Sequence, residues 1–322
     1  MVAQSIGKSK IKVGVSSCLL GQKVRYDSGH KRDRYVTDVL GRYFKFVPVC
    51  PEVELGMGVP RESVELRGKI DSPRMVGNKT GTDWTVKMNR FVKKRLRQLE
   101  SENLSGYILK KKSPSCGMER VKIYDANGVP SRKARGLWGG GLLGFFPILP
   151  VEEEGRLNDP RLRENFIVRV FAFHNLQQLF TGRFDRGEVV QFHMINKYLL
   201  LAHSQKHYKQ MGQLVAAVKK YRPTEFKEKY TSLFMEALRY KTTTRKNTNV
   251  VHHILGFLKN HLDPDDKQYI LSVIDDYHNE IVPLVVPLTL LKHYVDKFNI
   301  EYIKNQTYLN PHPKELMLRN HV

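Results

Sequence analysis

The sequence predicts an α/β N-terminal domain, with a mainly parallel sheet and helices on both faces, followed by an all-α helical C-terminal domain. Over residues 1–150, short apolar runs alternate with glycines and helical segments, which is typical of parallel α/β folds. From residue 161 onward glycines are few, and apolar positions recur at helical spacing. A length of 322 residues suits two domains, and we place them at residues 1–155 and 156–322.

The elements of the first domain follow from its apolar runs and from the segments between them. Strands are predicted at residues 11–17, 46–49, 105–109 and 121–124. Helices are predicted at residues 31–44 and 82–100. The last strand enters a turn at Asp125, Asn127 and Gly128. A short glycine-rich stretch, 136–144, then leads into the apolar run 145–151.

The second domain begins after the polar segment 152–160, which contains Gly, Asn and Pro and is predicted to be a linker. Asp263 and Pro264 form a good helix start, because an N-cap carboxylate precedes a proline in the first turn. The predicted amphipathic helices span residues 161–180, 188–209, 224–240, 249–261 and 264–280.

The composition excludes several classes of protein. A hydrophobic content of 41% and an aromatic content of 10% are too high for a disordered chain. Three cysteines are too few for a disulfide scaffold. No apolar run reaches the roughly 18 residues that span a bilayer, and no signal-peptide pattern is present at the start. We therefore expect a soluble, cytoplasmic protein with no membrane partner.

The charge is strongly basic, with 54 Lys and Arg against 32 Asp and Glu and a net charge of +22. Residues 1–150 hold 29 of these basic residues and 13 of the acidic ones, a net charge of +16. A field of this sign concentrates polyanions and speeds their encounter with the protein. Nucleic acid is therefore the expected partner.

Each cysteine follows an apolar run that reads as a strand. Cys18 follows IKVGVSS, Cys50 follows FKFVPV, and Cys116 follows GYILKKKSPS. Because the carboxyl ends of parallel strands share one sheet edge, the three thiols are expected to converge there. The residues themselves leave three readings open, namely buried small hydrophobes, a zinc site completed by His30, or an iron–sulfur cluster with one open iron.

Three segments carry a resemblance to a known family. VGVSSCLLGQKVRYDSGHKR, VPVCPEVELGMGVPRESVEL and ILKKKSPSCGMER resemble the bacterial thiouracil desulfurases, over about residues 10–153. About residues 160–320 are similar to a second family, once of unknown function, through HNLQQLFTGRFDRG, NKYLLLAHS, NTNVVHHILGFLK, PLTLLKHY and QTYLNPHPKELMLRN. Fused in this order, the two resemble bacterial enzymes that remove sulfur from 4-thiouridine in RNA, including tRNA.

The resemblance implies a 4Fe–4S cluster held by Cys18, Cys50 and Cys116. The implied reaction is a non-redox desulfuration of 4-thiouridine in RNA, with tRNA the expected substrate, that yields uridine and hydrosulfide. Three thiolates leave one iron without a protein ligand. A soft thiocarbonyl sulfur would bind that iron, and the binding would polarise the C–S bond.

Four further side chains near the cysteines receive predicted roles. Glu52 is the expected acid–base residue, with capping of its own loop as the alternative. Ser113 matches a serine of the resembled family, which implies that it assists at the substrate, with closure of a Ser-Pro turn as the alternative. Ser17 and Ser115 are expected to hydrogen-bond the cysteine sulfurs and so tune the cluster.

A basic surface near the cysteines is predicted to hold RNA phosphates, and no DNA partner is expected. The target base would have to leave its stack to reach a recessed cluster. Two other functions stay open: the same chemistry on a free thiolated base, and a non-catalytic RNA-binding protein with a structural zinc. The residues predicted to bind RNA are Arg25, Lys31, Arg32, Arg90, Lys93, Lys94, Lys110, Lys111 and Lys112.

Overall fold

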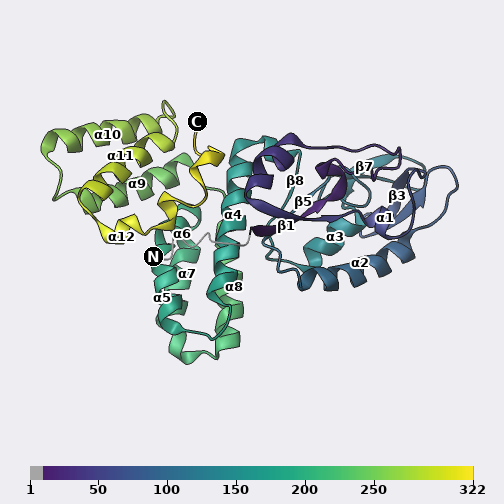
Figure 1. The fold of residues 1–322 in the computed structure, drawn as a ribbon, viewed down its shortest axis with the longest axis horizontal. Helices are drawn as coiled ribbons and strands as arrows, with labels where there is room; N and C mark the ends of the chain where they lie inside the picture. Colours follow the sequence, from purple (N-terminus) through teal and green to yellow (C-terminus); the bar gives the residue numbers. More distant parts are fainter. Residues whose placement is uncertain (1–9, 322) are drawn as a thin grey trace. The chain divides into compact units, whose positions relative to one another are not determined.

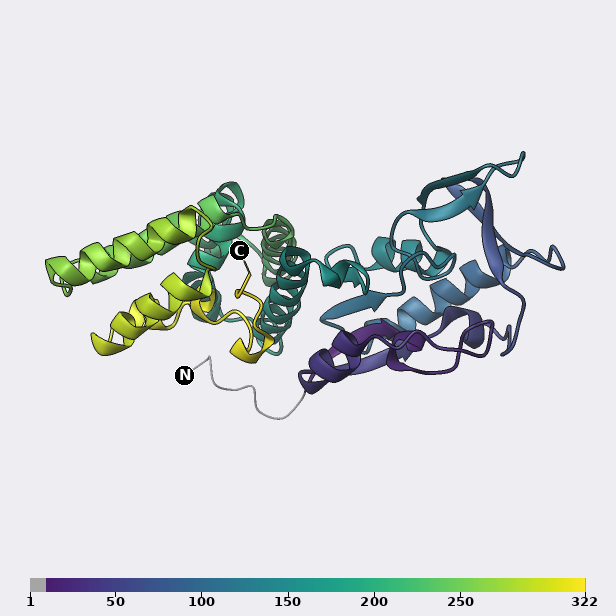
Figure 2. The same cartoon turned by 90° about the horizontal axis from the view of Figure 1, so that it is seen from above.

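The computed structural model describes residues 10–321, which form two compact units that meet in the sequence between Asp159 and Pro160. The first unit contains strands and helices, and the second contains helices alone (Figures 1 and 2). The predicted fold class is therefore confirmed. No helix within residues 10–321 is both long enough and apolar enough to cross a membrane.

The first sheet is parallel throughout and has the strand order β2-β1-β5-β8. β1 lies between β2 and β5. The chain first runs from β1 to β2 on one side of β1, and it later enters β5 on the other side. A reversal of this kind opens a crevice at the carboxyl ends of the strands, where open α/β sheets bind their ligands. The strands are β1 (Ile11–Ser16), β2 (Phe44–Val49), β5 (Gly106–Leu109) and β8 (Val151–Glu153).

The second sheet is mixed and has the order β4-β3-β6-β7. β3 pairs parallel with β6, and each of these two strands forms an antiparallel pair with an outer strand. Of its strands the sequence predicted only 121–124. In β3 only Leu66 is buried, so its apolar pattern is too short to stand out. The strands are β3 (Val64–Lys69), β4 (Ser72–Gly77), β6 (Val121–Tyr124) and β7 (Pro130–Ala134).

Two helices of the first unit lie side by side against the first sheet, α2 (Thr85–Glu100) and α3 (Leu137–Phe145) (Figure 1). The predicted helix 82–100 is confirmed, and its apolar stripe is buried. The stretch 136–144 was not predicted to be helical because five of its nine residues are glycines. The buried stripe of α2 consists of Met88, Val92, Leu96 and Leu99.

The predicted helix 31–44 is confirmed only in part, since the segment is helical over Tyr35–Val39, a π-helix, and Leu40–Arg42, a 3-10 helix, and contains no regular α-helix. Its buried apolar positions, Val36 and Leu40, are one turn apart and extend no further. The short helical segments of the first unit are η2 (Ser17–Leu20), η3 (Tyr35–Val39), η4 (Leu40–Arg42), α1 (Pro51–Glu54) and η5 (Arg156–Asn158).

The segment 152–160 is not an irregular linker. Its first residues complete β8, and the side chains of Glu152, Glu153 and Glu154 are all buried. A polar composition suggested a linker because buried carboxylates are rare unless they are paired. Glu152 pairs with Arg156 at 2.6 Å, and the partners of Glu153 and Glu154 in the first unit are described below.

The helical unit contains nine α-helices within the described residues. The single helix predicted at 188–209 is three helices, because Asn196 and Ser204 interrupt it and Ser204 caps the last one. The predicted Asp263 cap is confirmed, since its carboxylate accepts from Asp266 N at 2.7 Å. The helices are α4 (Pro160–Leu179), α5 (Arg186–Ile195), α6 (Lys197–His203), α7 (Gln205–Ala216), α8 (Pro223–Arg239), α9 (Thr244–Leu258), α10 (Pro264–His278), α11 (Val285–Lys297) and α12 (Glu301–Lys304), with short turns η6 (Val218–Lys220), η7 (Thr307–Leu309) and η8 (Lys314–Leu316).

Candidate functional site

The three cysteines follow three adjacent strands of the parallel sheet. Cys18 lies in η2 directly after β1, Cys50 comes directly after β2 and caps α1, and Cys116 lies in the loop after β5. Their charges interact: burial raises the pKa of Cys116, and Cys18 and Cys50 each add to this rise. The strand ends therefore bring the three thiols within electrostatic reach of one another.

The thiols lie in a poorly solvated place. Burial raises the pKa of Cys18 to about 11, although the ammonium of Lys110 opposes the rise, and burial also raises the pKa of Cys50. A hydrogen bond with Ser16 acts in the other direction on the pKa of Cys116. Without a cation these thiols hold their protons, so a metal or cluster that binds here must displace them.

The Cys116 loop is a turn closed by Ser113. The Ser113 hydroxyl accepts hydrogen bonds from Cys116 N at 3.1 Å and from Ser115 N at 3.3 Å, and Gly117 N donates to Ser113 O at 2.8 Å. Closure of the turn was one of the two roles considered for Ser113. The hydroxyl fixes the backbone from which the Cys116 thiol projects.

The N-terminus of α3 is hydrogen-bonded to the same Cys116 loop. Trp138 N and Gly139 N both donate to Ser115 O, at 2.9 and 3.1 Å, so loop carbonyls satisfy free amides at the helix start. This contact requires a glycine at position 139. A Cβ there would lie 2.5 Å from Gly117 O and 2.6 Å from Cys116 O.

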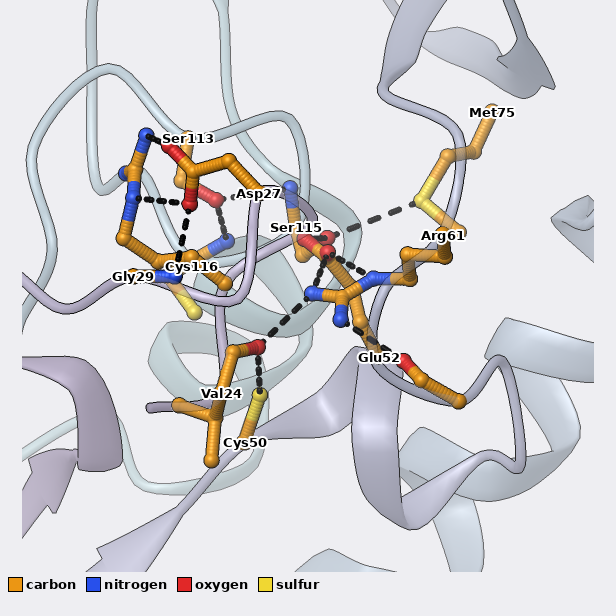
Figure 3. A network of polar contacts seen from close by, with 12 residues as sticks. Val24, Asp27, Gly29, Cys50, Glu52, Arg61, Met75, Ser113, Ser115 and Cys116 are labelled. Carbon is orange, nitrogen blue, oxygen red and sulfur yellow. Dashed lines mark hydrogen bonds and ion pairs between the residues drawn. The ribbon is translucent and has the colours of Figure 1, made fainter. Parts of the chain in front are cut away.

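Glu52 lies where the three cysteine-bearing segments meet (Figure 3). Its Oε1 accepts from Ser115 Oγ at 2.5 Å, and its Oε2 accepts from Arg61 Nε at 2.9 Å and also from Arg61 Nη2. The Arg61 side chain is only 5% exposed and that of Glu52 is 15% exposed. We call Val24, Glu52, Arg61 and Ser115 the loop junction. Both carboxylate oxygens have fixed donors, and Oε1, which has only one, keeps a lone pair for a further donor such as water.

The serines next to the cysteines differ from the prediction. Ser115 was expected to hydrogen-bond a cysteine sulfur, but it donates to Glu52 and contacts the thioether sulfur of Met75 at 3.7 Å. Ser16 is the serine that reaches the Cys116 thiol, and its Oγ also accepts from Lys110 N at 3.0 Å. Ser17 is buried at the start of η2.

The Cys50 segment is held from two sides. Cys50 N donates to Glu54 Oε1 at 3.0 Å, and Glu54 Oε2 accepts from Arg95 Nε of α2 at 2.8 Å. The Cys50 thiol contacts Val24 O at 3.8 Å. Val24 belongs to the segment that follows Cys18, so this contact joins two of the three cysteine segments.

Two buried glutamates at the end of β8, Glu153 and Glu154, hold the loop that carries Cys116. Glu154 pairs with the Lys110 ammonium and accepts from Lys111 N at 2.7 Å. Glu153 accepts from Met118 N at 2.8 Å, and burial raises its pKa. The polar composition of residues 152–160 predicts a linker, and these glutamates lie within it. The signal that could have found them is an acidic run placed directly after an apolar strand candidate.

The predicted RNA-binding cations fall into two groups. Arg25 and Lys110 lie near Cys18, since both lower its pKa, but Arg25 pairs with Asp27 at 3.3 Å and Lys110 pairs with Glu154. Arg32 is also paired, with Asp38 at 2.6 Å. The others are exposed, either on the loops or on the solvent face of α2, and they are Lys31, Arg90, Lys93, Lys94, Lys111 and Lys112.

His30, considered as a fourth zinc ligand, is exposed, and its Nδ1 accepts from Arg32 N at 3.2 Å. Within residues 10–321, no three side chains of Cys, His, Asp or Glu are held in the geometry of a single-metal site.

Comparison with known proteins gives each unit a family. Residues 13–154 match the 2-thiouracil desulfurase family, and residues 197–313 match DUF1722, described as a protein family of unknown function. The uncharacterized protein YbbK of Bacillus subtilis (strain 168) is 32% identical over 108 residues, which is 32% of this chain and 71% of that protein. The uncharacterized protein YbgA of Escherichia coli (strain K12) is 28% identical over 165 residues, 51% of this chain and 98% of that protein.

A solved structure, described as the [4Fe-4S]-dependent thiouracil desulfidase TudS, is 30% identical, covering 47% of this chain and 95% of that one, with a TM-score of 0.38. The fold and the site together define an α/β enzyme with a thiol-rich site at its strand ends, joined to a helical unit. Through residues 13–154 the chain belongs to the 2-thiouracil desulfurase family, and a DUF1722 region follows it.

Proposed function

We propose that this protein removes sulfur from 4-thiouridine in RNA, with tRNA as the substrate, using a 4Fe–4S cluster held by Cys18, Cys50 and Cys116. The observation that carries the proposal is Glu52, a carboxylate fixed where all three cysteine-bearing segments meet. Family membership supports the desulfuration of a thiolated pyrimidine. The solved relative is described as [4Fe-4S]-dependent.

The residues present fit such a cluster. Three thiols from three strand ends form the ligand set that leaves one iron without a protein ligand. When bound, the cluster supplies a soft Lewis acid that takes a thiocarbonyl sulfur and polarises its C–S bond. Thiolate formation is the main local obstacle, since burial raises the pKa of each thiol. The positive charge of iron compensates for that cost.

Glu52 acts as the acid–base residue. Its carboxylate accepts a proton from the water that attacks the ring carbon, and it later returns that proton as the C–S bond breaks. Ser115 and Arg61 hold the carboxylate in place during both transfers. The water supplies the new carbonyl oxygen and the sulfur leaves as hydrosulfide, so the overall reaction needs no electron donor or acceptor.

RNA as the substrate is supported by charge. Residues 1–150 carry a net charge of +16, and the exposed cations of α2 and the cysteine loops add sites for phosphates. A neutral free base gains little from such a field. The RNA-bound nucleotide must be unstacked before its sulfur reaches the cysteines, which costs a few kcal/mol.

Anaerobic assays with the reconstituted protein test this function. We expect loss of 4-thiouridine from thiolated tRNA, measured by nucleoside analysis, and release of hydrosulfide. Replacing Cys18, Cys50 or Cys116 by Ala should lower both iron content and turnover. If free 4-thiouracil is consumed and tRNA is left intact, the free base is the substrate. If the protein binds zinc without sulfide and leaves both compounds unchanged, the enzymatic proposal is wrong.

A further inference from the structure

Arg61 is a buried cation that the sequence did not single out, although it lies in one of the three family-like segments. Its guanidinium donates to the Glu52 carboxylate, to Gly58 O at 2.9 Å and to Val24 O at 3.0 Å. Its backbone N donates to Tyr26 O at 3.0 Å. Arg61 therefore binds the segment after Cys18 and the segment after Cys50 at the same time.

Val24 O is shared between Arg61 and the Cys50 thiol. The carbonyl accepts from Arg61 Nη2 and contacts Cys50 Sγ at 3.8 Å (Figure 3). Ser115, one residue before Cys116, completes the loop junction through Glu52. The three cysteine segments are thus tied to one another by side chains of the protein itself.

We propose that Arg61 is the positioning residue of this site. Its guanidinium fixes the Glu52 carboxylate and the Val24 carbonyl in place relative to the cysteines. The inference rests on the proposed function for its catalytic consequence. Only a planar, five-donor guanidinium can reach Glu52, Gly58 and Val24 together. A lysine ammonium keeps the charge but lacks this fork, so Arg61→Lys separates geometry from charge.

The expected kinetic effect is a loss in turnover without a loss in substrate binding. A misplaced acid–base residue costs on the order of 10²-fold in rate, so kcat of Arg61→Lys should fall about 10- to 100-fold. KM and iron content should stay within about twofold of the wild-type values. Guanidinium added to Arg61→Ala should restore part of its kcat. Arg67→Ala, which removes an exposed Arg–Glu pair on β3, is the matched control.

A second readout needs neither cluster nor substrate. In the apo-protein, Arg61→Lys keeps the positive charge that lowers the pKa of Cys50 but releases the segment of Val24, so alkylation of Cys50 by iodoacetamide should become several-fold faster. Wild-type kcat or wild-type Cys50 alkylation in Arg61→Lys would overturn the inference. A wild-type protein that desulfurates no thiolated pyrimidine would instead refute the proposed function, and the alkylation result would still decide on Arg61.

Discussion

The Ser115 hydroxyl donates to Glu52 Oε1 at 2.5 Å, which joins two residues 63 positions apart in the sequence. Each partner is a near neighbour of a cysteine, since Ser115 precedes Cys116 directly and Glu52 lies two residues after Cys50. The bond therefore joins two of the three cysteine-bearing segments through the Glu52 carboxylate. A hydrogen bond to a charged group contributes roughly 1.5–3 kcal/mol.

Glu52→Gln should abolish most of the turnover. The amide keeps the size of the side chain but cannot take a proton from water, and loss of a general base costs about 10²- to 10⁴-fold. We expect kcat for 4-thiouridine loss to fall within that range while iron content is retained. Glu65→Gln on β3, which removes a half-buried carboxylate paired with Arg67, should leave turnover unchanged. Equal activity in Glu52→Gln and wild type would show that Glu52 only caps its loop.

Ser115→Ala tests the link between Glu52 and the Cys116 segment. The residue is fully buried, so its loss leaves one carboxylate oxygen without its donor, which costs on the order of 1–3 kcal/mol. We expect a lower melting temperature and a kcat reduced about tenfold, measured on the same preparation. An unchanged kcat together with a lowered melting temperature would mean that the bond is purely structural.

Two glycines of α3 provide a matched pair of substitutions. Gly139→Ala would place its Cβ 2.5 Å from Gly117 O, whereas nothing lies within 4 Å of a Cβ at Gly144. Alanine in a helix is normally favoured over glycine by about 1 kcal/mol, so Gly144→Ala should be neutral or stabilising. Gly139→Ala should instead lower both thermal stability and iron content, since the Cys116 loop must move. Equal behaviour of the two variants would contradict the proposed support of that loop by α3.

The exposed cations of α2 are expected to bind RNA phosphates. Charge reversal of Lys93 and Lys94 to Glu should weaken tRNA binding, and each lost contact should reduce the slope of log K against log salt by roughly 0.7 to 0.9. Filter binding at several salt concentrations measures both effects. Lys267→Glu, at an exposed position of α10, is the control. If the control weakens binding as much, the effect comes from net charge and not from α2.

Acid should destabilise the helical unit through His203. The residue is 3% exposed, its Nδ1 lies 2.6 Å from Tyr240 O, and burial lowers its pKa from 6.5 to about 4. The unfolded chain takes up a proton below pH 6.5 that the folded chain refuses until about pH 4. The stabilisation is therefore complete above pH 6.5 and is lost as the pH falls to 4, by up to about 3 kcal/mol.

Thermal unfolding followed by circular dichroism between pH 7 and 4.5 measures this effect. His203→Gln keeps a donor for Tyr240 O but does not titrate, so its melting temperature should fall less steeply with acid. The same pH slope in both proteins would assign the acid sensitivity to other groups, such as His193 and His312, whose pKa values burial also lowers to about 4.

Three of the four strands of the parallel sheet could be predicted from the sequence because they are mainly apolar runs, whereas β8, which ends in two glutamates, resembles part of a linker. The cysteines could be placed at the edge of this sheet for the same reason, since each follows such a run. Of the second sheet only β6 was predicted, because β3 and β4 alternate short polar and apolar stretches that resemble loops. Arg61 and Glu154 were missed for a different reason. Arg61 and Glu154 bind residues that are far away in the sequence, Val24 and Lys110 respectively, and no local sequence pattern indicates such a pairing.

β8 and the glutamates that end it have a consequence for biosynthesis. All three cysteines leave the ribosome before residues 151–154. Until those residues appear, Lys110 and Met118, which flank the Cys116 loop, have no carboxylate partners. Domains fold largely as units while the chain is still growing. We therefore expect insertion of the proposed cluster to follow the emergence of residue 154. A nascent chain stalled before β8 would present three thiols with no finished site to protect them.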